Sequence, residues 1–220
     1  MNNRSKPQVT ASLSLSPTTH SYANSQAPNL NLTLISQYPD PITIYADNTS
    51  PALMLKCGAF IITDLVNGCE IKQSKSTHCR IPPPTKVPVP LNERLFYTLL
   101  PNTPLTLSAP FTRSRSGTGG KPLAKDDPDY TRDRSAKFGA CGVDGLEPGH
   151  DYALTLAPDP RVLWSYVRWW EYGTREQILN GEGNEVGGLD GRKVKFGHGP
   201  HDAIELDLTN VGVVVFHCQD

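Results

Sequence analysis

The sequence has no long apolar run and no excess of charge of either sign. Its 20 prolines and 18 glycines divide the 220-residue chain into short apolar segments, and none approaches the roughly 18 residues of a membrane-spanning helix. Lysine and arginine (21) nearly balance aspartate and glutamate (22). No strong field therefore directs the chain to nucleic acid or to an anionic membrane, and we expect neither as a partner.

Signals for export and for disulfide chemistry are missing too. The N-terminal stretch MNNRSKPQVTASLSLSP has no apolar segment of the kind found in secretory signals, so we expect a cytoplasmic protein. The five cysteines are odd in number, scattered and without a C-x-x-C pair. This pattern favours free thiols packed as small apolar groups over a disulfide framework.

The motifs of nucleophilic and metal-dependent hydrolases are also absent. The chain has no G-x-S-x-G nucleophile elbow and no H-E-x-x-H zinc motif. Neighbours along a strand point to opposite faces, so the two adjacent Cys–His pairs do not predict a dyad. His198, His201 and Asp202 lie on a glycine-proline loop, but the ligands needed to complete a metal site cannot be identified. We expect no bound metal and no cofactor.

What the chain does contain is alternation of apolar and polar residues with a period of two, which is typical of strands. Proline, glycine, asparagine or aspartate bounds each run, as turns between strands require. Seven such runs with almost no helical periodicity between them predict an all-β fold, a two-sheet antiparallel sandwich. The runs lie at 11–16, 30–36, 41–46, 59–65, 94–100, 104–111 and 150–157.

The order of these runs resembles a known domain. It is the immunoglobulin-like sandwich that precedes the catalytic domain of fungal deuterolysin-type metalloproteases, also found in free-standing fungal proteins. The resemblance covers roughly residues 9–157 and implies a fold, but no catalytic residue and no peptidase activity, because the zinc motif is absent. The resemblance is carried by five segments: L-S-P (Leu15, Ser16, Pro17), N-L-T-L at 31–34, P-I-T-I at 41–44, F-Y-T-L-L-P-N-T-P-L-T-L at 96–107 and G-L-E-P-G-H-D-Y-A-L-T-L at 145–156.

Other segments extend the sandwich. Residues 1–8 read as a flexible terminus, and 112–140 reads as a long mobile insertion because its apolar content is too low to fold alone. Residues 158–220 predict a strand, one short helix and terminal strands that pack on the sandwich. Thr174 and Gln177 form a capping-box pattern before REQILN, and the segments 203–208 and 211–216 predict a C-terminal β-hairpin.

All three tryptophans lie in WSYVRWWEYGT, residues 164–174. As one strand, this segment would direct large apolar side chains to both faces. The indoles could fill a folding core or line a pocket for an apolar ligand, and both interpretations stay open. Strand alternation places Trp164, Tyr166, Arg168 and Trp170 on one face, and Ser165, Val167 and Trp169 on the other.

Two functional hypotheses follow. The first is a non-proteolytic binding module for a small apolar ligand or a protein partner. The second is a cofactor-independent enzyme, of cyclase or isomerase type, that acts on a small apolar metabolite in a shaped pocket. The ligand-binding candidates are Trp164, Tyr166, Arg168 and Trp170, and the catalytic candidates are Glu171, Tyr172 and His150. The sequence does not indicate the oligomeric state.

Overall fold

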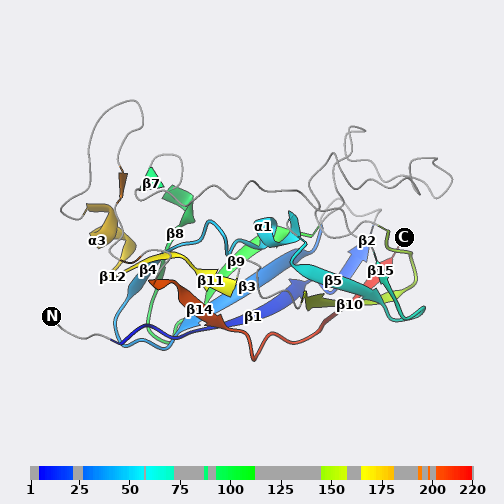
Figure 1. Cartoon of the computed structure of the whole chain (residues 1–220). Coiled ribbons are helices and arrows are strands. Elements are labelled where there is room, and N and C mark those ends of the chain that lie inside the picture. The colour runs from blue at the N-terminus through cyan, green and yellow to red at the C-terminus, as the bar shows by residue number, and fades with distance from the viewer. Residues whose placement is uncertain are drawn as a thin grey trace.

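The computed structural model of the chain describes residues 5–21, 27–56, 58–71, 87–88, 93–111, 145–157, 165–180, 193–194, 198 and 202–219. The insertion predicted at 112–140 and Trp164 lie outside these residues. Within the described part, most residues belong to strands arranged in layered sheets (Figure 1).

The first sheet carries an alternating pattern that separates an apolar inner face from a polar outer face. Leu30, Leu32 and Leu34 are buried, whereas most outer positions hold serine, threonine or asparagine. Thr33 and Thr106 share a hydrogen bond of 3.0 Å across this outer face. Its strand order is β11-β14-β1-β3-β9, with β1 at Val9–Ser16, β3 at Asn29–Ser36, β9 at Leu105–Pro110, β11 at Tyr166–Val167 and β14 at Ile204–Asp207.

The second sheet packs its apolar face against the first. Ile62, Tyr152, Leu154 and Phe216 from this sheet belong to the same core cluster as the leucines of β3. Phe216 stacks on Tyr152 with ring centroids 5.5 Å apart. The strand order is β2-β15-β10-β5-β6, with β2 at Thr19–Ser21, β5 at Phe60–Asp64, β6 at Cys69–Ile71, β10 at Asp151–Leu156 and β15 at Val214–Gln219.

This pairing of sheets is an immunoglobulin-like arrangement. Strands β1, β3 and β9 take the places of A, B and E, and β15-β10-β5-β6 takes the order G-F-C-C′. Tyr152 adds a tyrosine corner, in which the phenol accepts a hydrogen bond from the backbone N–H of Glu147 at 2.6 Å. The predicted all-β sandwich is confirmed.

A third sheet, β12-β4-β8, closes one end of the molecule (Figure 1). It consists of β4 (Ile42–Tyr45), β8 (Phe96–Leu99) and β12 (Trp169–Tyr172). Trp170 packs into the main core, whereas Trp169 packs into a second cluster with Tyr45 and Phe96. The two neighbouring indoles therefore serve two cores, one on each face of the sheet. A small pair joins β7 (Val87–Pro88) to β13 (Lys193–Val194).

The helices confirm one prediction and add an unpredicted element. In α3 (Arg175–Asn180), Gln177 Oε1 accepts from the Thr174 N–H at 2.7 Å, which confirms the capping box. The prediction of a single helix was wrong, because α1 (Pro51–Lys56) also forms and buries Met54 and Leu55. Pro51 at its first position is a helix-start signal. A 3-10 turn, η1 (Glu93–Leu95), precedes β8.

The predicted C-terminal hairpin was wrong. Strand β14 pairs with β1 and β11, and β15 pairs with β10 and β2, so the last two strands lie in different sheets. Each strand buries one face, and crossing between sheets lets Ile204 and Phe216 enter the shared core from opposite sides. The sheets are also not purely antiparallel, because the β1–β14 and β15–β2 pairs are parallel.

The single strand predicted across the tryptophan segment was also wrong. Tyr166 and Val167 pair with β14, and Trp169 to Tyr172 pair with β4, so the chain changes sheets at Arg168. The two halves cover the open edges of two different sheets, which one straight strand could not do. In the part of the chain that the structure describes, no helix is long and apolar enough to cross a membrane.

Candidate functional site

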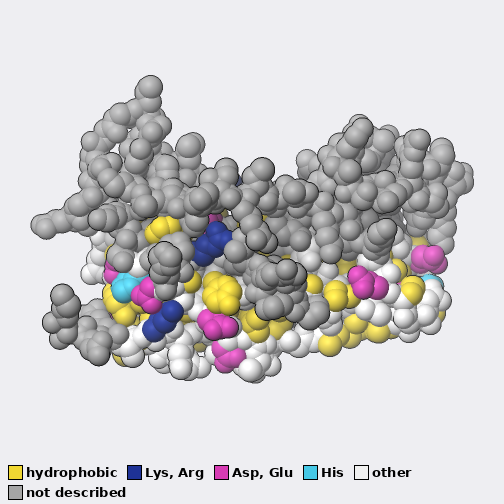
Figure 2. Space-filling model, viewed as in Figure 1, with side chains coloured by type: hydrophobic (Ala, Val, Ile, Leu, Met, Phe, Trp, Pro, Cys, Tyr) yellow, Lys and Arg dark blue, Asp and Glu magenta, His cyan; other side chains and the backbone are white. Residues whose placement is uncertain are grey.

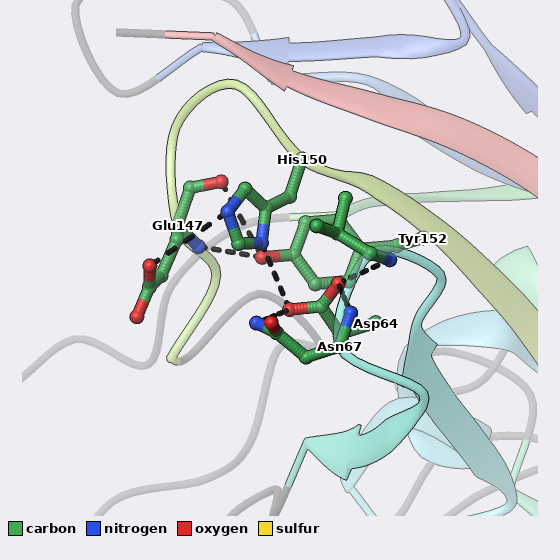
Figure 3. A network of polar contacts seen from close by, with 6 residues as sticks. Asp64, Asn67, Glu147, His150 and Tyr152 are labelled. Carbon is green, nitrogen blue, oxygen red and sulfur yellow. Dashed lines mark hydrogen bonds and ion pairs between the residues drawn. The ribbon is translucent and has the colours of Figure 1, made fainter.

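Histidine side chains paired with carboxylates lie at both ends of the molecule (Figure 2). The first such cluster, which we call the His150 trio, consists of Asp64, His150 and Glu147. His150 Nδ1 is 2.9 Å from Asp64 Oδ2, and His150 Nε2 is 3.9 Å from Glu147 Oε2. Figure 3 shows the imidazole between the two carboxylates, beside the ring of Tyr152. The trio therefore combines one direct hydrogen bond with one longer approach.

Two local structures position these side chains. Asp64 ends β5 and accepts hydrogen bonds from the backbone N–H groups of Val66 at 2.8 Å and Asn67 at 3.2 Å, which shape the β5–β6 turn. The Asn67 amide donates a further bond of 2.9 Å to Asp64 Oδ2. On the other side, the tyrosine corner holds the turn that carries Glu147 and His150. The trio thus ties two turns together at one end of the second sheet.

The hydrogen bonds to Asp64 change the pKa of its carboxyl group. Burial by itself would raise the pKa of Asp64, since its side chain is only 2 % exposed. Hydrogen bonds from His150, Val66 and Asn67 outweigh burial and lower the pKa to about 2. Burial, with the nearby Asp64 charge, also raises the pKa of Tyr152 to about 12. At neutral pH the carboxylate is therefore ionised and the phenol is neutral.

The second cluster, the His198 trio, consists of Asp202, His198 and Glu171. His198 Nδ1 is 2.6 Å from Asp202 Oδ2, and His198 Nε2 is 3.9 Å from Glu171 Oε1. The imidazole stacks on Trp170 with centroids 4.0 Å apart and planes 11° apart. Figure 2 shows histidine, acidic and basic side chains gathered at the end of the molecule where β12 lies. This trio has the same connectivity as the first.

The neighbours of the His198 trio are aromatic and charged. Tyr172 meets the His198 ring edge-on at 5.4 Å and donates its hydroxyl to the Ser5 carbonyl at 3.3 Å. Trp170 Nε1 donates to the Asp202 carbonyl at 2.7 Å. Lys6 Nζ lies 3.5 Å from Asp202 Oδ1, and both side chains are about half exposed. The cluster therefore joins β12 to the loop that precedes β14.

The structure brings together only some of the predicted residues. Trp170, Glu171 and Tyr172 converge with His198 and Asp202, whereas His150 lies in the other trio at the far end of the sandwich. The Tyr166 carbonyl accepts a hydrogen bond from the Asn48 amide. Burial raises the pKa of Asp47, and the nearby Arg168 guanidinium opposes this. Trp164 and His201 lie outside the described residues.

The His150 trio contains two residues that sequence reasoning missed. Asp64 and Glu147 were not candidates, although Glu147 and His150 flank the turn before β10. The signal for Asp64 is weak, because it and His150 are 86 positions apart. Asp151, the neighbour of His150, instead pairs with His217 at 2.7 Å on the outer face, in agreement with strand alternation. Among the described residues, no three His, Cys, Asp or Glu side chains gather closely enough to hold a metal ion.

A comparison with protein families, curated proteins and solved structures finds no match to this chain. The resemblance to the deuterolysin-type domain therefore stays a prediction. The interpretation of function depends on the surfaces and side-chain clusters of the chain itself.

Proposed function

We propose that this protein is a non-proteolytic binding module that presents one face of its sandwich to a protein partner. The proposal depends on four exposed residues, Leu65, Val66, Val213 and Val215, which we call the outer-face patch. They are 49 %, 61 %, 60 % and 51 % exposed, and all lie on β15, just before it, or in the β5–β6 turn of the same sheet. Figure 2 shows hydrophobic side chains at the surface in this half of the molecule.

The other sheet provides an internal contrast. The outer positions of β1, β3 and β9 carry exposed Ser14, Asn29, Thr106 and Ser108. An alternating strand can place either polar or apolar residues on its solvent side, and a polar side is the less costly choice in water. Among the described residues, four of the five exposed large apolar side chains lie on the second sheet, just before its strand β15 or in its β5–β6 turn, and the fifth is Leu100 after β8. Such a concentration is typical of surfaces that another molecule covers.

The observations favour a protein partner over a small apolar ligand. The pocket interpretation requires indoles that are open to solvent, but Trp169 is 5 % exposed and Trp170 is 1 % exposed. Both rings instead fill core clusters. An exposed strand face offers a broad surface, which suits the contact area of a protein rather than the enclosed site of a small molecule.

The test is a comparison of baits in an extract of the cells that express the protein. Val213→Asp/Val215→Asp should leave the melting temperature unchanged, because both side chains are exposed, and should abolish retention of a partner that the unmodified chain retains. Ser14→Asp/Asn29→Asp on the polar face is the matched control and should retain the partner. Equal retention by all three baits, or no retained protein, would refute the proposal.

A further inference from the structure

We propose that His150 is a general base for the hydrolysis of small uncharged carboxylic esters. In this proposal Asp64 positions the imidazole, and Glu147 helps to hold the attacking water. The two proposals share Leu65 and Val66, but their tests alter different side chains, Val213 and Val215 in one and His150 and Glu147 in the other, so either proposal can fail without the other.

The hydrogen bonds of Asp64 determine which imidazole nitrogen carries the proton. Asp64 accepts from the N–H groups of Val66 and Asn67 and from the Asn67 amide, in addition to its contact with His150. An ionised carboxylate only accepts hydrogen bonds. His150 Nδ1 must therefore donate to Asp64, and Nε2 of the neutral ring is left with a lone pair. This is the orientation that a general base requires.

Opposite Nε2 lies a second acceptor. Glu147 Oε2 is 3.9 Å from His150 Nε2, which is too long for a direct hydrogen bond. A neutral imidazole nitrogen and a carboxylate oxygen have no proton to share. A water molecule has two protons, so one water placed between them donates one proton to each. The geometry therefore points to a water held against the base.

The surroundings indicate the class of substrate. Leu65 and Val66 follow Asp64 directly and are 49 % and 61 % exposed, so they offer an apolar surface for a short acyl chain. The carboxylates of Asp64 and Glu147 disfavour an anionic substrate at this position. A small uncharged ester meets both conditions.

The reaction needs no protein nucleophile and no co-reactant besides water. The water oxygen attacks the ester carbonyl carbon while His150 Nε2 takes one of its protons. The tetrahedral intermediate then expels the alkoxide or phenoxide, which receives that proton from Nε2. Ester and water give acid and alcohol, and the imidazole returns to its starting state.

The experiment measures hydrolysis of para-nitrophenyl butyrate by the full chain in water and in deuterium oxide. His150→Asn keeps an N–H donor for Asp64 but removes the base, and should lower kcat/KM by about 100-fold, a typical contribution of general-base catalysis. The unmodified protein should react more slowly in deuterium oxide, because a proton moves in the rate-limiting step. His217→Asn, which alters another Asp–His pair on the outer face, should leave the rate unchanged.

A second variant guards against loss of the fold in His150→Asn. The Glu147 side chain is 55 % exposed, so Glu147→Gln should keep the melting temperature and lower kcat/KM about tenfold, below the effect of losing the base itself. Asp64→Asn tests positioning by a split between kcat and KM: it should lower kcat and leave KM nearly unchanged, because the base is still present but its ring is no longer held. The titratable groups that face His150 in the described part are Asp64, Glu147 and Tyr152.

Four results would overturn the proposal. They are a rate no higher than that of buffer, unchanged rates in both His150→Asn and Glu147→Gln, equal rates in water and deuterium oxide, and loss of activity in His198→Asn but not in His150→Asn. Equal rates in the two solvents would indicate direct attack by the imidazole. The last result would move the activity to the other trio.

Discussion

The His150 and His198 trios have the same chemical connectivity but different surroundings. Each imidazole bonds one aspartate through Nδ1 and has a glutamate oxygen 3.9 Å from Nε2. Asp64 is 2 % exposed and accepts three further hydrogen bonds, whereas Asp202 is 48 % exposed and has Lys6 beside it. The first aspartate is held by buried hydrogen bonds, and the second is held by His198 and the exposed Lys6.

The comparison separates two sources of order for the same side-chain pair. In the His150 trio, order comes from polar contacts, because the buried carboxylate must be satisfied by neighbouring donors. In the His198 trio, order comes from packing, because the imidazole lies flat against the buried ring of Trp170. Truncation of an aromatic ring should therefore lower the stability most at the His198 trio. Removal of a charge should lower it most at the His150 trio.

The largest expected effect is at the aromatic end. Trp170→Ala should lower the free energy of unfolding by about 3–5 kcal/mol, the usual cost of emptying a large buried aromatic site. The change also removes the platform under His198. Chemical denaturation followed by circular dichroism measures the change in the free energy of unfolding. Tyr172→Phe is the matched control and should change stability little, because its hydroxyl bond to Ser5 is exposed. A cost below about 1 kcal/mol for Trp170→Ala would contradict the assignment of this ring to the core.

The next effect concerns Asp64 and acid. Its pKa is lowered from 3.8 to about 2 in the folded protein, so the folded state binds this proton less readily than the unfolded state. The resulting stabilisation is present above pH 3.8 and is lost as pH falls toward about 2. Asp64→Asn should destabilise the protein at neutral pH. It should also weaken the loss of stability that the unmodified protein shows as pH falls below 3.8. Melting curves measured at several pH values test both results. A melting temperature that falls as steeply with decreasing pH in the variant as in the unmodified protein would contradict them.

The smallest effect is expected at Asp202. Asp202→Asn should cost no more than about 1 kcal/mol at neutral pH, because exposed ion pairs contribute little. The same substitution at the buried Asp64 should lower the melting temperature more. Thermal melting of the two variants side by side decides this. Equal losses would show that burial of the aspartate is not what distinguishes the two trios.

Sequence periodicity was a good guide to the strands and a poor guide to their partners. The runs at 30–36, 59–65 and 150–157 each form a strand within about a residue of the predicted ends. Alternation is a local property, since each strand must bury one face. By contrast, β14 and β15 enter different sheets, because pairing depends on which edges remain open after the other strands have packed.

The candidate sites divide in the same way. Trp170, Glu171 and Tyr172 are neighbours in the chain, and their grouping could be predicted from one segment. Asp64 could not be linked to His150, since the two residues meet only when β5 and β10 pair. The capping box at Thr174 and Gln177 was readable because both partners lie within one turn.

The sequence by itself determined the strand-rich character of the chain, the start of α3 and the separation of His150 from Asp151 on opposite strand faces. Each of these follows from residues a few positions apart, whose geometry the backbone sets directly. Only the tertiary structure decided that Trp169 and Trp170 belong to two cores, that the outer-face patch lies on one sheet, and that each of two distant histidines meets two carboxylates. These arrangements depend on the register of segments far apart in the chain, and register is set by the packing of the whole core.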